Sequence, residues 1–157
     1  MRSETREGYT DSDSRRSSCR TRDDWMGPGS WFEYSMTEER SDLPDDKVWN
    51  EKYVVTSVED ERIVFDHYEN GKKLEQVIGN RDCANGIIGM NGLHKVGNEE
   101  LDTSFGKVSV CVYRSDRCGG GTEIFIDSQG MMYKSIESQL WSMGIRHSVT
   151  RKLVNRG

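Results

Sequence analysis

The chain has 157 residues, of which 33% are hydrophobic and 31% charged, and its formal net charge is −5. One domain of ordinary size fits this length and two do not, while the low apolar content means that the core is concentrated in a few segments or completed by a second subunit. We therefore expect a single domain that forms a homodimer. The negative charge argues against a bulk attraction to nucleic acid, so a nucleic-acid surface would have to be local.

The sequence predicts neither a membrane segment nor a metal site. Its apolar runs fall far short of the roughly 20 residues that cross a bilayer, and the N-terminus has no stretch like that of a signal peptide. The cysteines are irregularly spaced and lack the paired Cys-x-x-Cys pattern of a zinc site: they are Cys19, Cys83, Cys111 and Cys118. We therefore expect an intracellular protein with reduced thiols and no membrane contact.

Composition divides the chain into three regions. Residues 1–24 are almost entirely polar, which predicts a disordered arm because nothing in them offsets the entropy cost of ordering. Residues 25–145 contain the apolar segments and are expected to form the single domain. Residues 146–157 carry basic side chains and no acid, and we interpret them as a basic C-terminal tail.

Aromatic side chains begin directly after the arm. Ser30 fits an N-cap, and Glu33 three residues later completes a capping box. The pattern predicts a short helix that runs to about Arg40. On such a helix Trp31 and Tyr34 share a face, because residues three apart are neighbours.

A hairpin, or one strongly bent strand, and then a second helix are expected next. Residues 52–58 and 62–68 alternate in the manner of strands, and the acidic residues between them form a turn. Residues 72–78 favour a helix that stops at a glycine. Glycines then interrupt residues 85–97, which predicts an irregular stretch.

The second half of the chain carries the clearest strands. Residues 107–114 and 122–128 predict an antiparallel hairpin with a glycine-rich turn, one face of its first strand being apolar and the other wet. Apolar residues then recur at helical spacing and would cover the apolar face: they are Met132, Ile136, Leu140 and Met143. We therefore predict an α+β fold, in which helices cover one face of an antiparallel or mixed sheet and leave the other face exposed.

Three short motifs follow one another along the chain. They are 30–34 (Ser-Trp-Phe-Glu-Tyr), 76–79 (Gln-Val-Ile-Gly) and 124–130 (Ile-Phe-Ile-Asp-Ser-Gln-Gly). Together with the order of the expected elements, they resemble the tombusvirus nineteen-kilodalton RNA-silencing suppressor family, with the aureusvirus suppressors as the nearest subfamily. The resemblance spans roughly residues 25–144, with gaps between the motifs.

The resemblance implies a plant-virus suppressor of RNA silencing in the host cytoplasm. Such a protein is a homodimer with a sheet continued across the subunits, and it sequesters double-stranded RNA, small interfering duplexes above all, without sequence specificity. In this role Trp31 and Tyr34 would stack on duplex ends; a place in the core or at the dimer seam is the other interpretation of both rings. A-form RNA is held through donors on a curved face, and the candidates for its backbone are Lys52, Thr56, Lys107, Ser109, Tyr113, Arg114 and Ser128.

The sequence contains no recognisable catalytic pattern. Cys83 with His67 or His94 lacks a local signature of nucleophile and base, and the glycine run at 119–121 lacks the Lys and Ser/Thr of a phosphate loop. We therefore predict a binding protein that is not an enzyme, with no cofactor and no small-molecule substrate. The alternative to RNA binding is a protein-interaction module that acts through its acidic surface and exposed aromatic residues.

Overall fold

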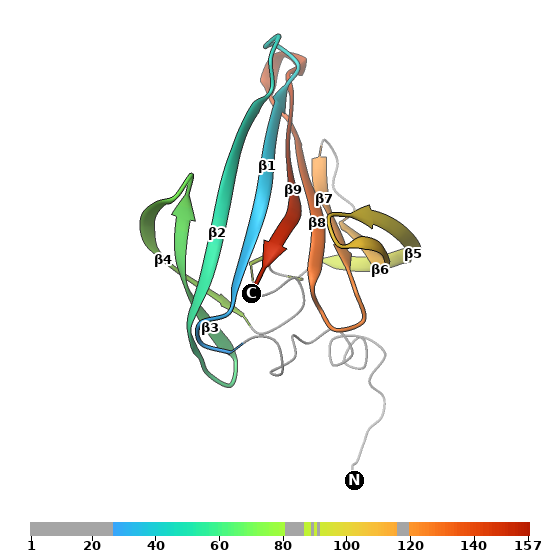
Figure 1. The fold of residues 1–157 in the computed structure, drawn as a ribbon. Helices are drawn as coiled ribbons and strands as arrows, with labels where there is room; N and C mark the ends of the chain where they lie inside the picture. Colours follow the sequence, from blue (N-terminus) through green and yellow to red (C-terminus); the bar gives the residue numbers. More distant parts are fainter. Residues whose placement is uncertain (1–26, 81–86, 89, 91, 116–119) are drawn as a thin grey trace.

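The computed structural model describes residues 27–80, 87–88, 90, 92–115 and 120–157. These residues form one antiparallel nine-stranded sheet in the order β4-β3-β2-β1-β9-β8-β7-β6-β5, and Figure 1 shows the central strands rising together while both edges curl away. Within the described part, a single 3₁₀ turn, η2 (Ser142–Gly144), is the one helical element. The strands are β1 (Trp31–Arg40), β2 (Lys47–Val58), β3 (Arg62–Glu69), β4 (Lys72–Asn80), β5 (Leu93–Thr103), β6 (Gly106–Ser115), β7 (Gly120–Ile126), β8 (Met132–Leu140) and β9 (Arg146–Arg156).

The predicted α+β class is wrong, because the three segments expected to be helical are strands. Residues 30–40, 72–78 and the segment after Gly130 contribute β1, β4 and β8. β1 is paired with β2 on one side and β9 on the other, and this cross-strand pairing outweighs a local capping preference. In β1 every second side chain is buried, which is the period of a strand: these are Phe32, Tyr34 and Met36.

No helix covers the sheet in the described residues, so the expected helical cover is also wrong. Of the apolar residues at helical spacing, Met132 is buried, whereas Leu140 is 54% and Met143 96% exposed. Pairing with β7 on one side and β9 on the other makes this segment a strand. The helix-like spacing of these apolar residues is therefore coincidental, and pairing with the neighbouring strands decides the conformation.

Both predicted hairpins are confirmed. β2 pairs with β3 around the acidic turn, and β6 pairs with β7. The alternation in β6 is also as predicted, since Val110 and Val112 are buried while Lys107 and Ser109 are exposed. The predicted arm lies outside the described residues. Of the stretch 85–97, expected to be irregular, residues 85, 86, 89 and 91 also lie outside them, whereas for residues 93–97 the prediction is wrong because they begin strand β5.

The C-terminal residues form a central strand instead of a tail. β9 lies between β1 and β8 in the middle of the sheet. Gly157 extends the pairing, because its N–H donates to the Trp31 carbonyl oxygen at 3.0 Å and its own carbonyl oxygen accepts from the Trp31 N–H at 2.9 Å. The basic residues expected in a tail are thus part of the sheet: Arg146, Arg151, Lys152 and Arg156.

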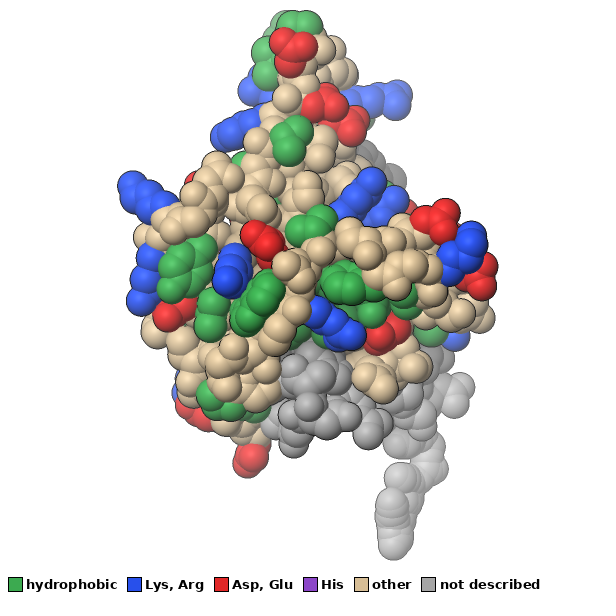
Figure 2. Space-filling model, in the orientation of Figure 1, with side chains coloured by type: hydrophobic (Ala, Val, Ile, Leu, Met, Phe, Trp, Pro, Cys, Tyr) green, Lys and Arg blue, Asp and Glu red, His purple; other side chains and the backbone are tan. Residues whose placement is uncertain are grey.

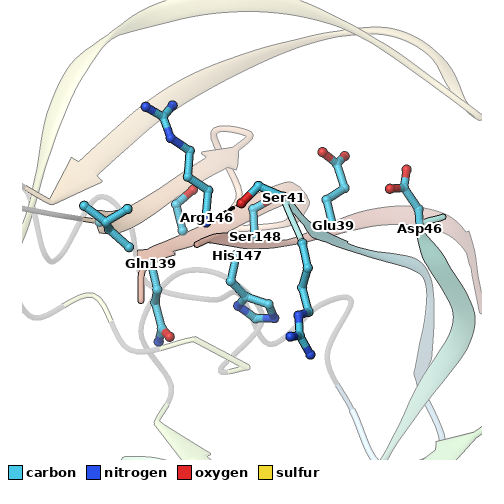
Figure 3. Close-up of a pocket in the computed structure, with 11 residues that line it drawn as sticks. Glu39, Ser41, Asp46, Gln139, Arg146, His147 and Ser148 are labelled. Carbon is cyan, nitrogen blue, oxygen red and sulfur yellow. Dashed lines mark hydrogen bonds between the residues drawn. The ribbon is translucent and has the colours of Figure 1, made fainter. Parts of the chain in front are cut away.

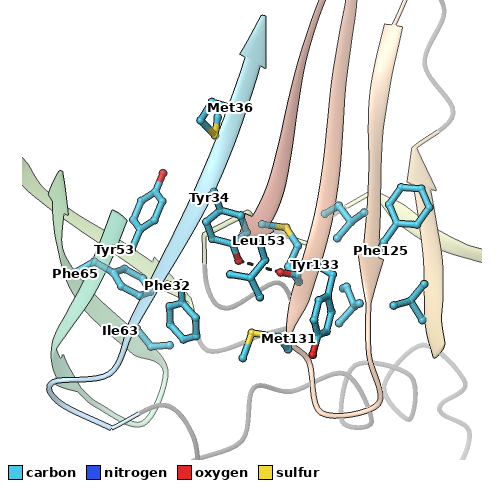
Figure 4. Packing of buried hydrophobic residues seen from close by; sticks show 14 of the residues in the cluster. Phe32, Tyr34, Met36, Tyr53, Ile63, Phe65, Phe125, Met131, Tyr133 and Leu153 are labelled. Atoms are coloured by element: carbon cyan, nitrogen blue, oxygen red, sulfur yellow. Dashed lines mark hydrogen bonds between the residues drawn. The ribbon is translucent and has the colours of Figure 1, made fainter. Parts of the chain in front are cut away.

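The hydrophobic core occupies the half of the sheet that holds the C-terminus, which we call the closed end (Figure 4). Tyr34 is fully buried there, and its hydroxyl donates to the Met132 carbonyl oxygen at 3.0 Å, which links β1 to β8. Three consecutive residues of β7 are buried, so both faces of the sheet are covered at this point: they are Ile124, Phe125 and Ile126.

The sheet supplies part of this cover by curling on itself. Phe105, in the turn between β5 and β6, lies against Tyr133 of β8, with ring centroids 6.0 Å apart and planes at 77°. On the other side of the molecule, Tyr53 packs edge to face against Phe65 at 5.9 Å. The connection between β4 and β5 adds apolar side chains to the core: Ile87, Ile88 and Met90.

Candidate binding site at the distal end of the sheet

Two turns meet at the end of the sheet opposite the core, and we call this region the distal end. It consists of residues 41–46 between β1 and β2, residues 141–145 between β8 and β9, and the strand residues beside them (Figure 1). The Ser41 N–H donates to the Arg146 carbonyl oxygen at 2.9 Å, and the Arg146 N–H donates to Ser41 Oγ at 2.8 Å. These reciprocal bonds hold the two turns together.

The distal end exposes apolar side chains that the fold does not bury. Figure 2 shows hydrophobic side chains beside acidic ones at the upper tip of the molecule. Met143 stands in a left-handed backbone with φ 64°, which a side-chain-bearing residue rarely adopts. Four of the eight large apolar side chains found exposed in the described residues belong to this end: Met143 at 96%, Val48 at 65%, Leu140 at 54% and Leu43 at 50%.

A hollow of about 630 Å³ opens beside these residues (Figure 3). Its floor is a row of cross-strand partners, in which Ser148 of β9 stands between Glu39 of β1 and Ser138 of β8. Figure 3 shows the carboxylates of Glu39 and Asp46 pointing to the same side. Leu140 and Arg146 also line the hollow, which therefore offers hydroxyls, both signs of charge and an apolar wall.

The opposite face of the same strands braces the two turns. Glu38 Oε2 lies 2.6 Å from His147 Nε2, and the His147 ring stacks on Trp141 with centroids 4.4 Å apart. The Trp141 indole N–H donates to Gln139 Oε1 at 2.7 Å, and the Arg40 guanidinium lies 5.1 Å from the Trp141 ring centroid. The distal end is therefore a supported platform and not a pair of independent loops.

Acidic groups predominate on this platform. Arg40 donates two hydrogen bonds to Asp42, at 3.1 and 2.7 Å, and these bonds lower the pKa of the Asp42 carboxyl. Within the described part of the chain, Glu39, Asp45 and Asp46 form no ion pair. In the same described residues Arg146 also forms no ion pair, but these acids outnumber it, so the net charge around the exposed apolar residues is negative.

The predicted end-stacking pair does not form one surface. In a strand, residues three apart point to opposite faces, and Tyr34 is fully buried while Trp31 is half-buried. The Lys52 ammonium lies 4.3 Å from the centroid of the Trp31 ring. In this structure Tyr34 belongs to the core, which was the other interpretation of that ring.

The predicted RNA-backbone residues are spread over the sheet. Lys52 and Thr56 are on β2, whereas the β6 group is separated from them by four strands, about 24 Å at the usual strand spacing. Several are already occupied: Thr56 Oγ1 donates to the Val64 carbonyl oxygen at 3.1 Å, and Lys107 Nζ lies 3.1 Å from Asp102. The rest of the predicted group comprises Ser109, Tyr113 and Arg114, the last paired with Glu123, and Ser128 in the turn after β7.

A second polar cluster is buried between β2 and β3. Glu51 is only 8% exposed and accepts hydrogen bonds from the Trp49 indole at 2.8 Å and the Tyr53 hydroxyl at 2.7 Å, with His67 Nε2 at 3.2 Å. Burial alone would raise the pKa of Glu51, but these hydrogen bonds and the nearby Arg151 lower it. Burial also raises the pKa of Tyr53. Both carboxylate oxygens of Glu51 have partners, and His67 connects β3 to β2, so the cluster links strands; beside it, among the residues that the structure describes, the buried Arg151 Nε is left without a partner.

The described residues contain no group of three or more His, Cys, Asp and Glu side chains placed to hold a metal ion. Among the same residues, no helix has the length and apolar character of a membrane span. The sequence reasoning missed the distal end, although the Leu-Pro-Asp-Asp turn at 43–46 and the apolar residues at 140–145 were both visible. Their sequence separation concealed that they meet.

Comparison with known proteins gives distant structural neighbours only. No protein-family model and no curated protein matches the chain. A crystal structure of MucB in complex with MucA(peri) aligns over 83% of this chain and 51% of that chain, with a TM-score of 0.40 and 16% identity. The Pseudomonas aeruginosa MucA/MucB complex aligns over 83% and 52%, with a TM-score of 0.40 and 13% identity.

A LolA superfamily protein, NE2245 from Nitrosomonas europaea, aligns over 91% of this chain and 93% of that chain, with a TM-score of 0.31 and 8% identity. The chain spans about half the length of the MucB chains that it matches. These likenesses are too distant to carry an argument about function, which therefore depends on the site itself.

Proposed function

We propose that the chain is a non-enzymatic protein-interaction domain that docks a partner polypeptide at its distal end. The observation that carries this proposal is the concentration there of half of the large exposed apolar side chains in the described residues, four of eight. Exposed apolar groups with a polar rim are typical of interaction sites.

The chemistry of the distal end specifies the partner. Glu39 and Asp46 line the hollow, and Asp45 lies in the adjacent turn. Among the described residues these acids outnumber the one unpaired base of the hollow, Arg146, so a complementary segment carries Lys or Arg beside a large apolar side chain. The hollow of about 630 Å³ has room for such a side chain, and Leu140 supplies an apolar wall. The bracing by Trp141 and His147 supports binding, because a preorganised surface loses little entropy when a partner docks.

Selection from a displayed peptide library on the full chain tests the proposal. Enriched peptides should combine a large apolar residue with Lys or Arg, and the double variant Leu43→Ser/Met143→Ser should bind them at least about tenfold more weakly. The matched control is Ile78→Ser/Val96→Ser, which removes apolar side chains that are 62% and 44% exposed on the edge strands. This control should leave binding unchanged.

Two results would contradict the proposal. One is peptide binding that survives in the Leu43→Ser/Met143→Ser variant. The other is sedimentation of the protein with neutral phosphatidylcholine vesicles, abolished by the same substitutions, in the absence of any enriched peptide. That outcome would show that the partner of the distal end is a lipid surface and not a polypeptide.

Duplex RNA, predicted from the sequence resemblance, stays a prediction for a different surface of the molecule. A gel-shift experiment with a short blunt RNA duplex at low salt tests it, because contacts to phosphates weaken steeply as salt rises. Retardation that is lost in Trp31→Ala would support a role for that ring, which is half-buried and therefore partly accessible.

A further inference from the structure

Two lysines stand directly opposite each other in the middle of the sheet. Lys134 of β8 and Lys152 of β9 are cross-strand partners, and the Cβ atoms of such partners lie about 5 Å apart on one face. Like charges in this arrangement destabilise a sheet. Without a counter-charge, the pairing of these two lysines is therefore unfavourable to the fold.

Within the described part of the chain, no carboxylate forms an ion pair with either lysine. The neighbouring acid, Asp102, lies 3.1 Å from Lys107 Nζ instead. Lys134 Nζ lies 5.3 Å from the centroid of the Phe125 ring, a contact that positions the ammonium group without neutralising it. Both positive charges can thus meet an external anion.

A cavity of about 280 Å³ opens beside the pair, between the central strands and the β5–β6 turn. Ser35 of β1 is the cross-strand partner of Lys152, so a hydroxyl and two ammonium groups form one row along the cavity. Ser104 contributes a second hydroxyl from the turn on the other side. Leu101 and Val154 add apolar wall, and Asp102 is the one carboxylate among the described lining residues; apolar surroundings strengthen charge interactions.

We propose that this cavity binds a phosphate group. Lys134 and Lys152 supply the positive charge, and the hydroxyls of Ser35 and Ser104 donate to the remaining oxygens. A bound phosphate converts the repulsion between the lysines into two favourable contacts, which explains why they are paired. The site lies apart from the distal end and does not depend on protein docking there.

Thermal unfolding with increasing inorganic phosphate, against chloride at equal ionic strength, tests the proposal. The midpoint should rise with phosphate and not with chloride, because a ligand that binds the folded state stabilises it. Lys134→Gln and Lys152→Gln should each weaken the apparent affinity about tenfold. Lys95→Gln, which removes an exposed lysine from edge strand β5, is the control and should leave the response intact.

Lys134→Glu separates a ligand site from a structural role. It replaces the like-charge pair with an ion pair, so the unfolding midpoint without phosphate should rise while the phosphate response disappears. Asp102→Asn removes a carboxylate from the cavity wall and should strengthen phosphate binding a few-fold.

The source of the phosphate is resolved with a short RNA duplex as a second probe. Duplex binding that is weakened by Lys134→Gln and Lys152→Gln would show that the same site accepts backbone phosphate. The proposal is overturned if phosphate and chloride give equal responses and the duplex shows no dependence on either lysine. It is also overturned if Lys95→Gln abolishes the response as fully as the pair does.

Discussion

The closed end and the distal end are built from the same long strands, yet they place apolar side chains in opposite ways. At the closed end, β1, β8 and β9 bury Tyr34, Met132 and Leu153 completely or nearly so. At the distal end, strand ends and turns expose Leu140 and Met143 to solvent. The comparison teaches that folding is served by one half of the sheet, so the apolar residues of the other half are available for binding.

The sharpest test of this division compares one substitution at each end. Phe65→Ala removes a fully buried ring at the closed end and should lower the free energy of unfolding by about 3–5 kcal/mol. Met143→Ser should change it by less than about 0.5 kcal/mol, because the side chain makes almost no packing contact. Urea denaturation measures both values, and similar losses at the two ends would break the comparison.

The pH dependence of stability provides a second comparison of the two ends, through Glu51. Its pKa is lowered in the folded protein, so its contribution to stability is complete above the unfolded value near 4.3 and is lost as pH falls through the folded value. Glu51→Gln should cost about 1–3 kcal/mol at neutral pH, because the amide keeps one acceptor oxygen and turns its NH2 group toward the other donor, either the Trp49 indole or the Tyr53 hydroxyl. The variant should also lose less stability than the parent on acidification.

The matched control for Glu51 is Asp42→Asn at the distal end. The pKa of Asp42 is also lowered, by its hydrogen bonds with Arg40, but this pair is exposed and screened by salt. The stability that this pair loses on acidification should therefore be small and should fade in high salt. If the two substitutions changed the loss of stability on acidification equally, the greater burial of the Glu51 carboxylate would have no effect and the comparison would fail.

The bracing beneath the distal end predicts a smaller effect. His147→Ala removes the stack on Trp141 and the contact with Glu38, and should lower the free energy of unfolding by about 1 kcal/mol. Amide hydrogen exchange should accelerate in the two turns and not at the closed end. Exchange that accelerates uniformly would show that the brace supports the whole sheet.

The smallest effect is expected at Met143. Met143→Gly relieves the strain of the left-handed backbone at φ 64°, but it also raises the conformational entropy of the unfolded chain. Because these two effects on stability oppose each other, the free energy of unfolding should stay within about 0.5 kcal/mol of the parent. Peptide binding, in contrast, should weaken because the exposed side chain is gone. This variant therefore separates the docking role from the backbone role of the residue.

The sequence predicted those parts of the fold that are decided locally. Residues 52–58 and 62–68 pair as expected because alternation and an acidic turn lie next to each other in the chain. The prediction of a helix at 30–40 was wrong because pairing with β9, more than one hundred residues away, outweighs the local capping pattern. A single segment carries no information about such a partner.

The candidate site was unpredictable for the same reason. Leu43 and Met143 are unremarkable apolar residues in separate turns, and only the pairing of β1 with β9 brings those turns together. The lysine pair depends equally on register, since Lys134 and Lys152 become neighbours only when β8 and β9 are aligned. One residue of slippage would send one lysine to the opposite face.

The central position of β9 has a consequence for how the chain folds. β1 to β4 form one meander and β5 to β8 another, each through pairing of strands that are neighbours in sequence, whereas β9 is the described strand that pairs with both. The seam closes contacts between residues far apart in sequence, such as Glu38 and His147, which are 109 residues apart, and such contacts are slow to form. Until residues 146–156 insert, the inner edges of β1 and β8 are open to strands of other chains, which makes seam closure the step most exposed to aggregation.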